Sequence, residues 1–228
     1  MSLEGGLSRR QCLGGALTTG ALGLLSLSRA AHAGAQIEEP LIDSVRTALS
    51  SAIHNKAPPV PQFPSTETRL AYLRWLGEMS ERLKKKIADA PSRIEFLQTV
   101  WYEAKRSGLE VSLVLGLVQV ESNFRKFAVS SAGARGYMQV MPFWTRVIGD
   151  SDPAKLFHMQ TNLRFGCVIL RHYLDRENGD LYMTLGRYNG SRGKSPYPNA
   201  VFANQRLWVF NDRPQEREKD KDRASAAG

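Results

Sequence analysis

The stretch that decides the fold of this chain is residues 118–142, which read VQVESNFRKFAVSSAGARGYMQVMP. An aliphatic stripe at helical spacing leads into it and ends in a carboxylate: Val114, Leu117, Val118 and Glu121. Such a stripe faces the core, so the Glu121 carboxylate is drawn toward the interior. Burial and a helix C-terminus both raise a carboxyl pKa, and a carboxyl protonated near neutral pH suits a general acid. From helix geometry alone, a Glu that turns to solvent is the preferred interpretation.

The loop after this helix is suited to close approach of a ligand. Residues 130–136 are small except for Arg135, and the two glycines among them, Gly133 and Gly136, let the backbone lie near a bound molecule. An aromatic, a soft apolar and an amide side chain follow, in the order Tyr137, Met138 and Gln139. This mixture suits a sugar, which has apolar ring faces and polar edges. Taken alone, Met138 is better explained as a residue that fills the core.

The rest of the chain has the pattern of helices. Apolar residues recur at helical spacing, with no alternating strand pattern and no internal repeat. Ser92 and Glu95 have the spacing of a capping box, and Gly108 should end the helix that they open. The sequence therefore predicts an all-α fold, with helices at residues 41–53, 66–87, 92–107, 110–122, 143–148, 162–176, 180–188 and 199–210.

Four segments are expected along the chain. A targeting segment, residues 1–33, precedes N-terminal helices at 34–90 that are interrupted by a proline-rich linker. Residues 91–210 form the domain that holds the stretch quoted above. Residues 211–228 mix acidic and basic residues without an apolar anchor, so we expect a disordered tail.

The targeting segment has the features of an export signal. Arg9 and Arg10 precede a weakly apolar run, residues 12–27, that is too short to span a membrane. Small residues around His32 predict cleavage after Ala33. The paired arginines favour the twin-arginine route, with an ordinary secretory signal or an uncleaved anchor as alternatives. We expect an exported protein, periplasmic or associated with the cell wall, without a lipid anchor and without a membrane span after cleavage.

Composition narrows the possible partners. The formal net charge of +9 suits an anionic polymer, an anionic lipid or a nucleic acid, and also suits simple solubility. No nucleic-acid module, zinc-protease motif, paired-cysteine metal site or phosphate-binding loop occurs in the sequence, so no metal, cofactor or nucleic-acid partner is predicted. Removal of residues 1–33 leaves Cys167 as a lone thiol in an apolar helical run, which is typical of a buried, inert cysteine.

Three short motifs occur in a fixed order: Glu121-Ser122, then GARGYMQ at residues 133–139, then Tyr188-Asn189-Gly190. Each motif is weak alone, and Tyr188-Asn189 by itself is better explained as a helix end and its turn. As an ordered set they resemble the motifs of the soluble lytic transglycosylase (SLT) domain, over roughly residues 90–210. This resemblance implies a lysozyme-like helical domain, related to goose-type lysozyme, that acts on peptidoglycan glycan strands.

The resemblance also implies a reaction. Glu121 would protonate the glycosidic oxygen between N-acetylmuramic acid and N-acetylglucosamine. Most glycosidases use a second carboxylate, but none lies near these motifs in the sequence. The 2-acetamido group would stabilise the cationic centre instead. Glu121 would then take the proton of the C6 hydroxyl and close a 1,6-anhydro ring, so no water enters the product and the enzyme is a lyase.

The same resemblance assigns roles to the other motif residues. Ser122 would hold the substrate or the acid, and Gln139 with the backbone around Met138 would bind the N-acetyl group. Tyr188 would orient Glu121, and Asn189 would bind sugar. The glycines that shape the loops and turns would be Gly133, Gly136 and Gly190.

Two residues depart from the pattern of the family. Tyr137 stands where the family usually has Leu, which would change the shape of the sugar groove. Arg187 stands where the family usually has Ala, and would alter helix packing or reach a peptide carboxylate. Two alternatives stay open: a hydrolytic, lysozyme-like muramidase, and a non-catalytic protein that binds the cell wall or a secretion machinery.

Overall fold

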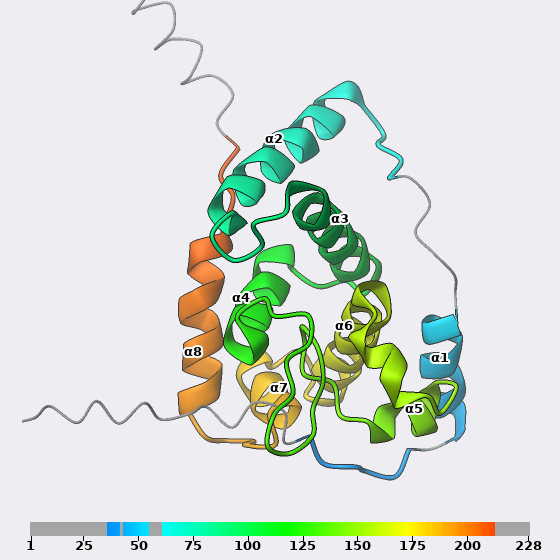
Figure 1. Ribbon diagram of the computed structural model, residues 1–228. Coiled ribbons are helices and arrows are strands. Elements are labelled where there is room, and N and C mark those ends of the chain that lie inside the picture. The colour runs from blue at the N-terminus through cyan, green and yellow to red at the C-terminus, as the bar shows by residue number, and fades with distance from the viewer. Residues whose placement is uncertain (1–35, 42, 55–60, 213–228) are drawn as a thin grey trace, which may run out of the picture.

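The computed structural model describes residues 36–41, 43–54 and 61–212 (Figure 1). The predicted signal peptide, the charged tail after Asp212 and the first half of the proline-rich linker lie outside these residues. Within them the chain forms helices and no strand, which confirms the predicted all-α class. Two isolated antiparallel bridges, Val129 with Arg135 and Arg135 with Val140, occur in the loop after α4. The helices are α1 (Asp43–His54), α2 (Thr66–Leu83), α3 (Ala90–Arg106), α4 (Val111–Ser122), α5 (Phe143–Ile148), α6 (Met159–Arg176), α7 (Leu181–Tyr188) and α8 (Pro196–Gln205), with short 3-10 helices η1 (Pro153–Phe157) and η2 (Arg206–Trp208).

Local chemistry moved several helix ends from their predicted places. Helix α3 begins at Ala90, because the Asp89 carboxylate accepts a hydrogen bond from the Ser92 backbone N–H at 2.9 Å. The predicted capping box at Ser92 is therefore wrong. Helix α8 begins with Pro196, which fits the first turn of a helix, and ends at Gln205. The predicted helix over 199–210 is thus wrong at both ends, whereas α5 has the predicted bounds.

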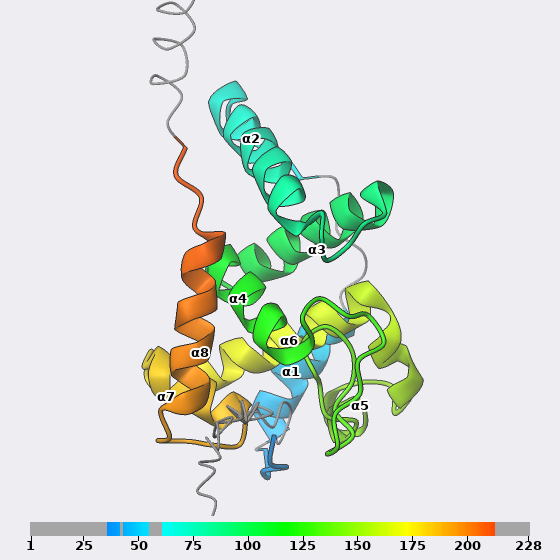
Figure 2. The same cartoon turned by 60° about the vertical axis from the view of Figure 1, so that its left-hand side comes forward.

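Helix α4 lies at the centre of the protein. Its aliphatic residues Val114, Leu115, Leu117 and Val118 are fully buried, and each contributes about 1.5–3 kcal/mol when it leaves water. Helix α8 runs alongside α4 (Figure 2). Gly116 permits this approach, because a Cβ there would lie 2.6 Å from the backbone nitrogen of Gln205. Helix α4, which carries Glu121, is therefore held against α8 by close backbone contact.

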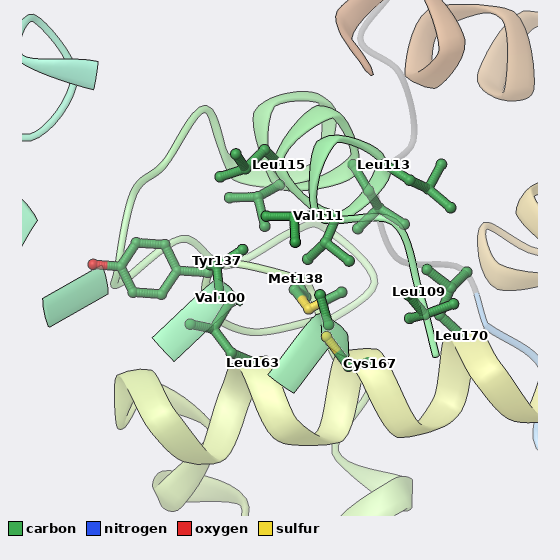
Figure 3. Close-up of a cluster of buried hydrophobic side chains, with 14 of the residues drawn as sticks. Val100, Leu109, Val111, Leu113, Leu115, Tyr137, Met138, Leu163, Cys167 and Leu170 are labelled. Carbon is green, nitrogen blue, oxygen red and sulfur yellow. The ribbon is translucent and has the colours of Figure 1, made fainter. Parts of the chain in front are cut away.

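The core joins α4 to the loop that follows it and to α6. Figure 3 shows Tyr137 and Met138 of that loop packed with α4 residues and with Leu163, Cys167 and Leu170 of α6. Cys167 is buried and free, as predicted. The N-terminal helices share this core, since α2 packs on α3, and α1 packs on α5 and α6. Among the described residues, no helix is both long enough and apolar enough to cross a membrane.

Candidate active site

The last turn of α4 places a carboxyl group in the interior. Glu121 is 5 % exposed, so the preferred interpretation from helix geometry, a side chain that turns to solvent, is wrong. The helix ends immediately after it because Asn123 adopts the left-handed conformation, with φ of 50°, that asparagine tolerates well. Burial raises the pKa of Glu121 to about 8. The group therefore carries its proton at neutral pH.

One hydroxyl group holds this acid, and it comes from a residue that the motifs did not indicate. The Tyr197 hydroxyl, in the first turn of α8, donates a short hydrogen bond to Oε1 of Glu121, which partly offsets the effect of burial on the pKa. Burial, followed by the charge of Glu121, raises the pKa of Tyr197 well above its ordinary value, so the phenol stays a donor. Oε2 of Glu121 is buried and has no hydrogen-bond partner among the described residues.

No second carboxylate acts on this acid within the described part of the chain. The pKa of Glu121 is set by burial and by Tyr197 alone. Residues 36–41, 43–54 and 61–212 also contain no group of three His, Cys, Asp or Glu that could hold a metal ion. Glu121 is a carboxyl group that can give up and take back one proton.

Polar side chains of the first two motifs tie the loop to itself and to α4. The Ser122 hydroxyl lies 2.8 Å from the Tyr137 carbonyl oxygen and 3.1 Å from that of Val118, and donates to these acceptors. The Gln139 side-chain amide donates to the carbonyl oxygens of Gly136, at 2.9 Å, and Ala128, at 3.1 Å. These groups therefore fix the conformation of the loop around Met138.

Asn162 of α6 is buried next to the same loop and forms several hydrogen bonds there. Its Oδ1 accepts from the Met138 backbone N–H, and its Nδ2 donates to the carbonyl oxygens of Arg135 and Leu156, all at 2.8 Å. Gly136 lies directly on this amide, with φ of 75°, so a Cβ would overlap the Asn162 side chain. Gly136 is thus required for both its conformation and its size.

The side chains of Tyr137 and Met138 both enter the core. The Tyr137 ring is 5 % exposed and its centroid lies 4.8 Å from that of Phe96. Met138 is fully buried against Gly166, whose missing side chain leaves the space for it. Neither side chain is available at the surface, and the Met138 backbone is buried with them, since its N–H donates to Asn162 and its carbonyl oxygen accepts from Tyr188.

The third motif joins the second through a buried hydrogen bond. The Tyr188 hydroxyl, at the end of α7, donates to the Met138 carbonyl oxygen at 2.8 Å. The hydroxyl that contacts the acid is that of Tyr197, although the charge of Glu121 is near enough to raise the pKa of Tyr188 in addition to burial. Asn189 is 7 % exposed; its Nδ2 donates to Ser191, while its buried Oδ1 has no partner among the described residues. Gly190 has φ of 72°, as a turn of this kind needs.

The fold and this geometry define an all-α domain in which the buried acid Glu121 ends a central helix, followed by a tightly bonded loop. The family model described as "Transglycosylase SLT domain" matches residues 98–205. Residues 98–205 are therefore similar to the SLT domain of lytic transglycosylases, as the ordered motifs indicated.

Sequence comparison finds relatives that are named transglycosylases. The chain is 37 % identical over 114 residues to a membrane-bound lytic murein transglycosylase C of Haemophilus ducreyi, a match that covers 43 % of this chain and 31 % of the relative. It is 29 % identical over 128 residues to the transglycosylase of Enterobacteria phage PRD1, covering 53 % and 47 %. One similar solved structure is that of an inactive mutant of the lytic transglycosylase Slt of Pseudomonas aeruginosa. It is 26 % identical in sequence and has a TM-score of 0.39, and the match covers 64 % of this chain and 24 % of that chain. The chain spans about a third of the length of the first of these relatives.

Proposed function

We propose that this protein is a lytic transglycosylase that cleaves the β-1,4 bond between N-acetylmuramic acid and N-acetylglucosamine in peptidoglycan. The observation that carries the proposal is the state of Glu121: a single buried carboxyl group whose pKa of about 8 leaves it protonated at neutral pH. A general acid needs this state. The family match and the names of the relatives support the substrate class.

The reaction proceeds in two proton transfers through one residue. Glu121 gives its proton to the glycosidic oxygen as the bond from that oxygen to C1 of N-acetylmuramic acid breaks. The 2-acetamido oxygen of the same sugar stabilises the positive charge at C1. The C6 hydroxyl oxygen then bonds to C1, and the Glu121 carboxylate takes the C6 hydroxyl proton. The acid is restored, the product carries a 1,6-anhydro ring, and no water is consumed.

The surrounding residues have supporting roles in this proposal. Tyr197 keeps Oε1 of Glu121 fixed and stabilises the carboxylate between the two transfers. Oε2, which lacks a partner among the described residues, is the oxygen that exchanges the proton. Ser122, Gln139 and Tyr188 hold the loop around Met138 in place. The free Oδ1 of Asn189 accepts a hydrogen bond from the sugar.

Product analysis of digested cell wall tests the reaction. Purified peptidoglycan is incubated with wild type, Glu121→Gln and Glu110→Gln, and the released muropeptides are identified by mass spectrometry. Glu110 is a matched control, because it is exposed at the opposite end of α4 and its side chain makes no capping hydrogen bond. We expect anhydro-muropeptides from wild type and Glu110→Gln, and none from Glu121→Gln.

Each other outcome has a definite meaning. Products with reducing ends would make the protein a hydrolytic muramidase. No product from wild type would leave a non-catalytic wall-binding protein. Equal yields from Glu121→Gln would remove this residue from the reaction.

We further propose that the protein is exported and acts on the wall from the periplasm or the cell-wall space. The targeting pattern of residues 1–33 and a substrate outside the cytoplasm support this location. The positive net charge suits an acidic, peptide-bearing polymer. Arg9→Lys combined with Arg10→Lys should block export by the twin-arginine route, as judged by cell fractionation. Unchanged export would exclude that route and favour the general secretory one.

A further inference from the structure

A short segment from the N-terminal part of the chain contacts the loop of the candidate site. We call residues 36–41 the N-terminal strap; Figure 1 shows it in blue, running beneath the domain toward α1. Gln36 is 4 % exposed, and its Oε1 accepts hydrogen bonds from the Trp144 indole N–H at 3.0 Å and from the Met141 backbone N–H at 3.4 Å. The strap therefore binds the point where the loop of the second motif enters α5. It lies outside the residues that match the family model.

The same strap is bound to the helix that carries the third motif. Glu39 pairs with Arg187 of α7 at 2.6 Å and with Arg176 of α6 at 2.5 Å. Arg187 also pairs with Glu177, which in turn binds Arg192 at 2.8 Å. Glu39 and Arg187 are both mostly buried, so solvent and salt screen their attraction less than they screen an exposed pair.

This contact gives Arg187 a partner within the chain. The residue precedes Tyr188 directly. Its guanidinium group reaches the carboxylates of Glu39 and Glu177. Arg187 and the N-terminal strap therefore belong to the same ion-pair network.

The two ends of the N-terminal strap contact residues beside the second and third motifs, which the Tyr188 hydrogen bond joins. Gln36 holds Met141, three residues after Met138, and Glu39 holds Arg187, next to Tyr188. The Tyr188 hydroxyl closes the connection by donating to the Met138 carbonyl oxygen. Gln36 is itself beside Tyr188, since its side chain works against the rise in the pKa of that phenol. A displacement of the N-terminal strap would therefore also displace the second and third motifs.

We propose that the N-terminal strap positions the active-site loop and α7 relative to each other, with Gln36 and Glu39 as positioning residues for the reaction of Glu121. This inference rests on the proposed function. Neither residue touches the acid, so each acts through the loop or through α7. Because a catalytic geometry tolerates only about 0.5 Å of displacement, and about 1 Å of misplacement can cost on the order of 10²-fold in rate, loss of either anchor should lower kcat.

The test uses three single variants in the full chain. Gln36→Met keeps the size of the side chain but removes the acceptor, and Glu39→Gln removes the charge that pairs with Arg187. Glu38→Gln is the matched control in the same segment, because Glu38 and its partner Arg146 are 49 % and 63 % exposed, and such a pair contributes little. Circular dichroism and the unfolding midpoint establish that each variant is folded at the assay temperature.

We expect kcat for anhydro-muropeptide release to fall about tenfold in Gln36→Met and Glu39→Gln, with KM changed less than about twofold. A looser loop admits water around Glu121, so the alkaline limb of the pH–rate profile should move to lower pH. Glu38→Gln should match wild type in all three quantities. Folded variants with unchanged kcat and an unchanged alkaline limb would overturn the proposal.

Amide hydrogen exchange separates this proposal from the proposed function. Loss of an anchor should speed exchange at residues 137–141 in Gln36→Met and Glu39→Gln, but not in Glu38→Gln. If wild type releases no anhydro-muropeptides, the proposed function fails and the exchange rates alone decide whether the strap orders the loop. In that case as well, unchanged exchange rates in both strap variants would overturn the proposal that the strap orders the loop.

A double-mutant cycle tests the ion pair itself. Glu39→Gln and Arg187→Gln, alone and combined, should be non-additive in kcat, since both remove the same contact. Additive losses would show that Glu39 does not act through Arg187.

Discussion

Two of the glutamates buried among the described residues, Glu103 and Glu121, lie in opposite kinds of surroundings. Glu103 of α3 is fully buried between two guanidinium groups, with Arg164 Nε at 3.0 Å and Arg106 Nη1 at 3.2 Å. Glu121 of α4 is almost as buried, but its only partner among the described residues is the Tyr197 hydroxyl. Charge on Glu103 is compensated by neighbouring charges, whereas charge on Glu121 is opposed by burial. The comparison separates a carboxylate that stabilises the fold from a carboxyl group that is available for proton transfer.

The largest expected difference is in catalysis. Glu121→Gln removes the proposed general acid, so kcat/KM for anhydro-muropeptide release should fall by about 10³-fold or more. Glu103→Gln should leave kcat/KM of the folded enzyme within a few-fold of wild type. Steady-state assays on protein with verified circular dichroism would measure both. A similar loss of activity in the two folded variants would abolish the distinction.

The second difference is in stability, and here the roles reverse. Glu103→Gln leaves the mostly buried Arg164 without its charged partner, which should lower the free energy of unfolding by about 3–5 kcal/mol. Urea unfolding at pH 7 measures this value. A loss below about 1 kcal/mol would mean that the pair contributes little to the fold.

The third difference depends on pH. The folded-state pKa of Glu121 is raised from 4.5 to about 8, so between these values the native state holds a proton that the unfolded chain releases. The native state is therefore penalised increasingly as pH rises through that window, and not below pH 4.5. Glu121→Gln removes the penalty and should stabilise the protein by about 3 kcal/mol at pH 7 relative to its effect at pH 4. A gain independent of pH between 4 and 8 would contradict the raised pKa.

The smallest expected effect concerns the hydroxyl that holds the acid. Tyr197→Phe removes a hydrogen bond that lowers the pKa of Glu121, so that pKa should rise further. The alkaline limb of the pH–rate profile should move to higher pH, and kcat should fall about tenfold because Oε1 loses its fixed position. Tyr102→Phe, at a half-buried tyrosine of α3, is the control. An unchanged or lowered alkaline limb in Tyr197→Phe would show that Tyr197 does not act on the acid.

Much of the helical framework could be predicted because it depends on local patterns. The aliphatic stripe of α4 and the bounds of α5 were predicted from the spacing of residues in the sequence. The start of α3 was predicted wrongly because Ser92 and Asp89 compete for the same role, and the pattern alone does not rank them. Errors of this kind arise where two local signals overlap.

The partners of the site residues could not be predicted, because they come from distant parts of the chain. Tyr197 meets Glu121 across 76 residues, and only the packing of α8 on α4 brings them together. The strap contacts span more than a hundred residues, from Gln36 to Trp144 and from Glu39 to Arg187. No periodicity or motif in the sequence encodes such a pair.

The sequence by itself determined that a carboxylate follows an aliphatic stripe, that a small-residue loop comes next, and that a Tyr-Asn-Gly turn lies further on. These features depend on helix periodicity and on residue size, which act over a few residues. Only the tertiary structure decided that Glu121 is protonated and which hydroxyl holds it. Its pKa is set by desolvation, and desolvation is a property of the packed interior that surrounds the residue.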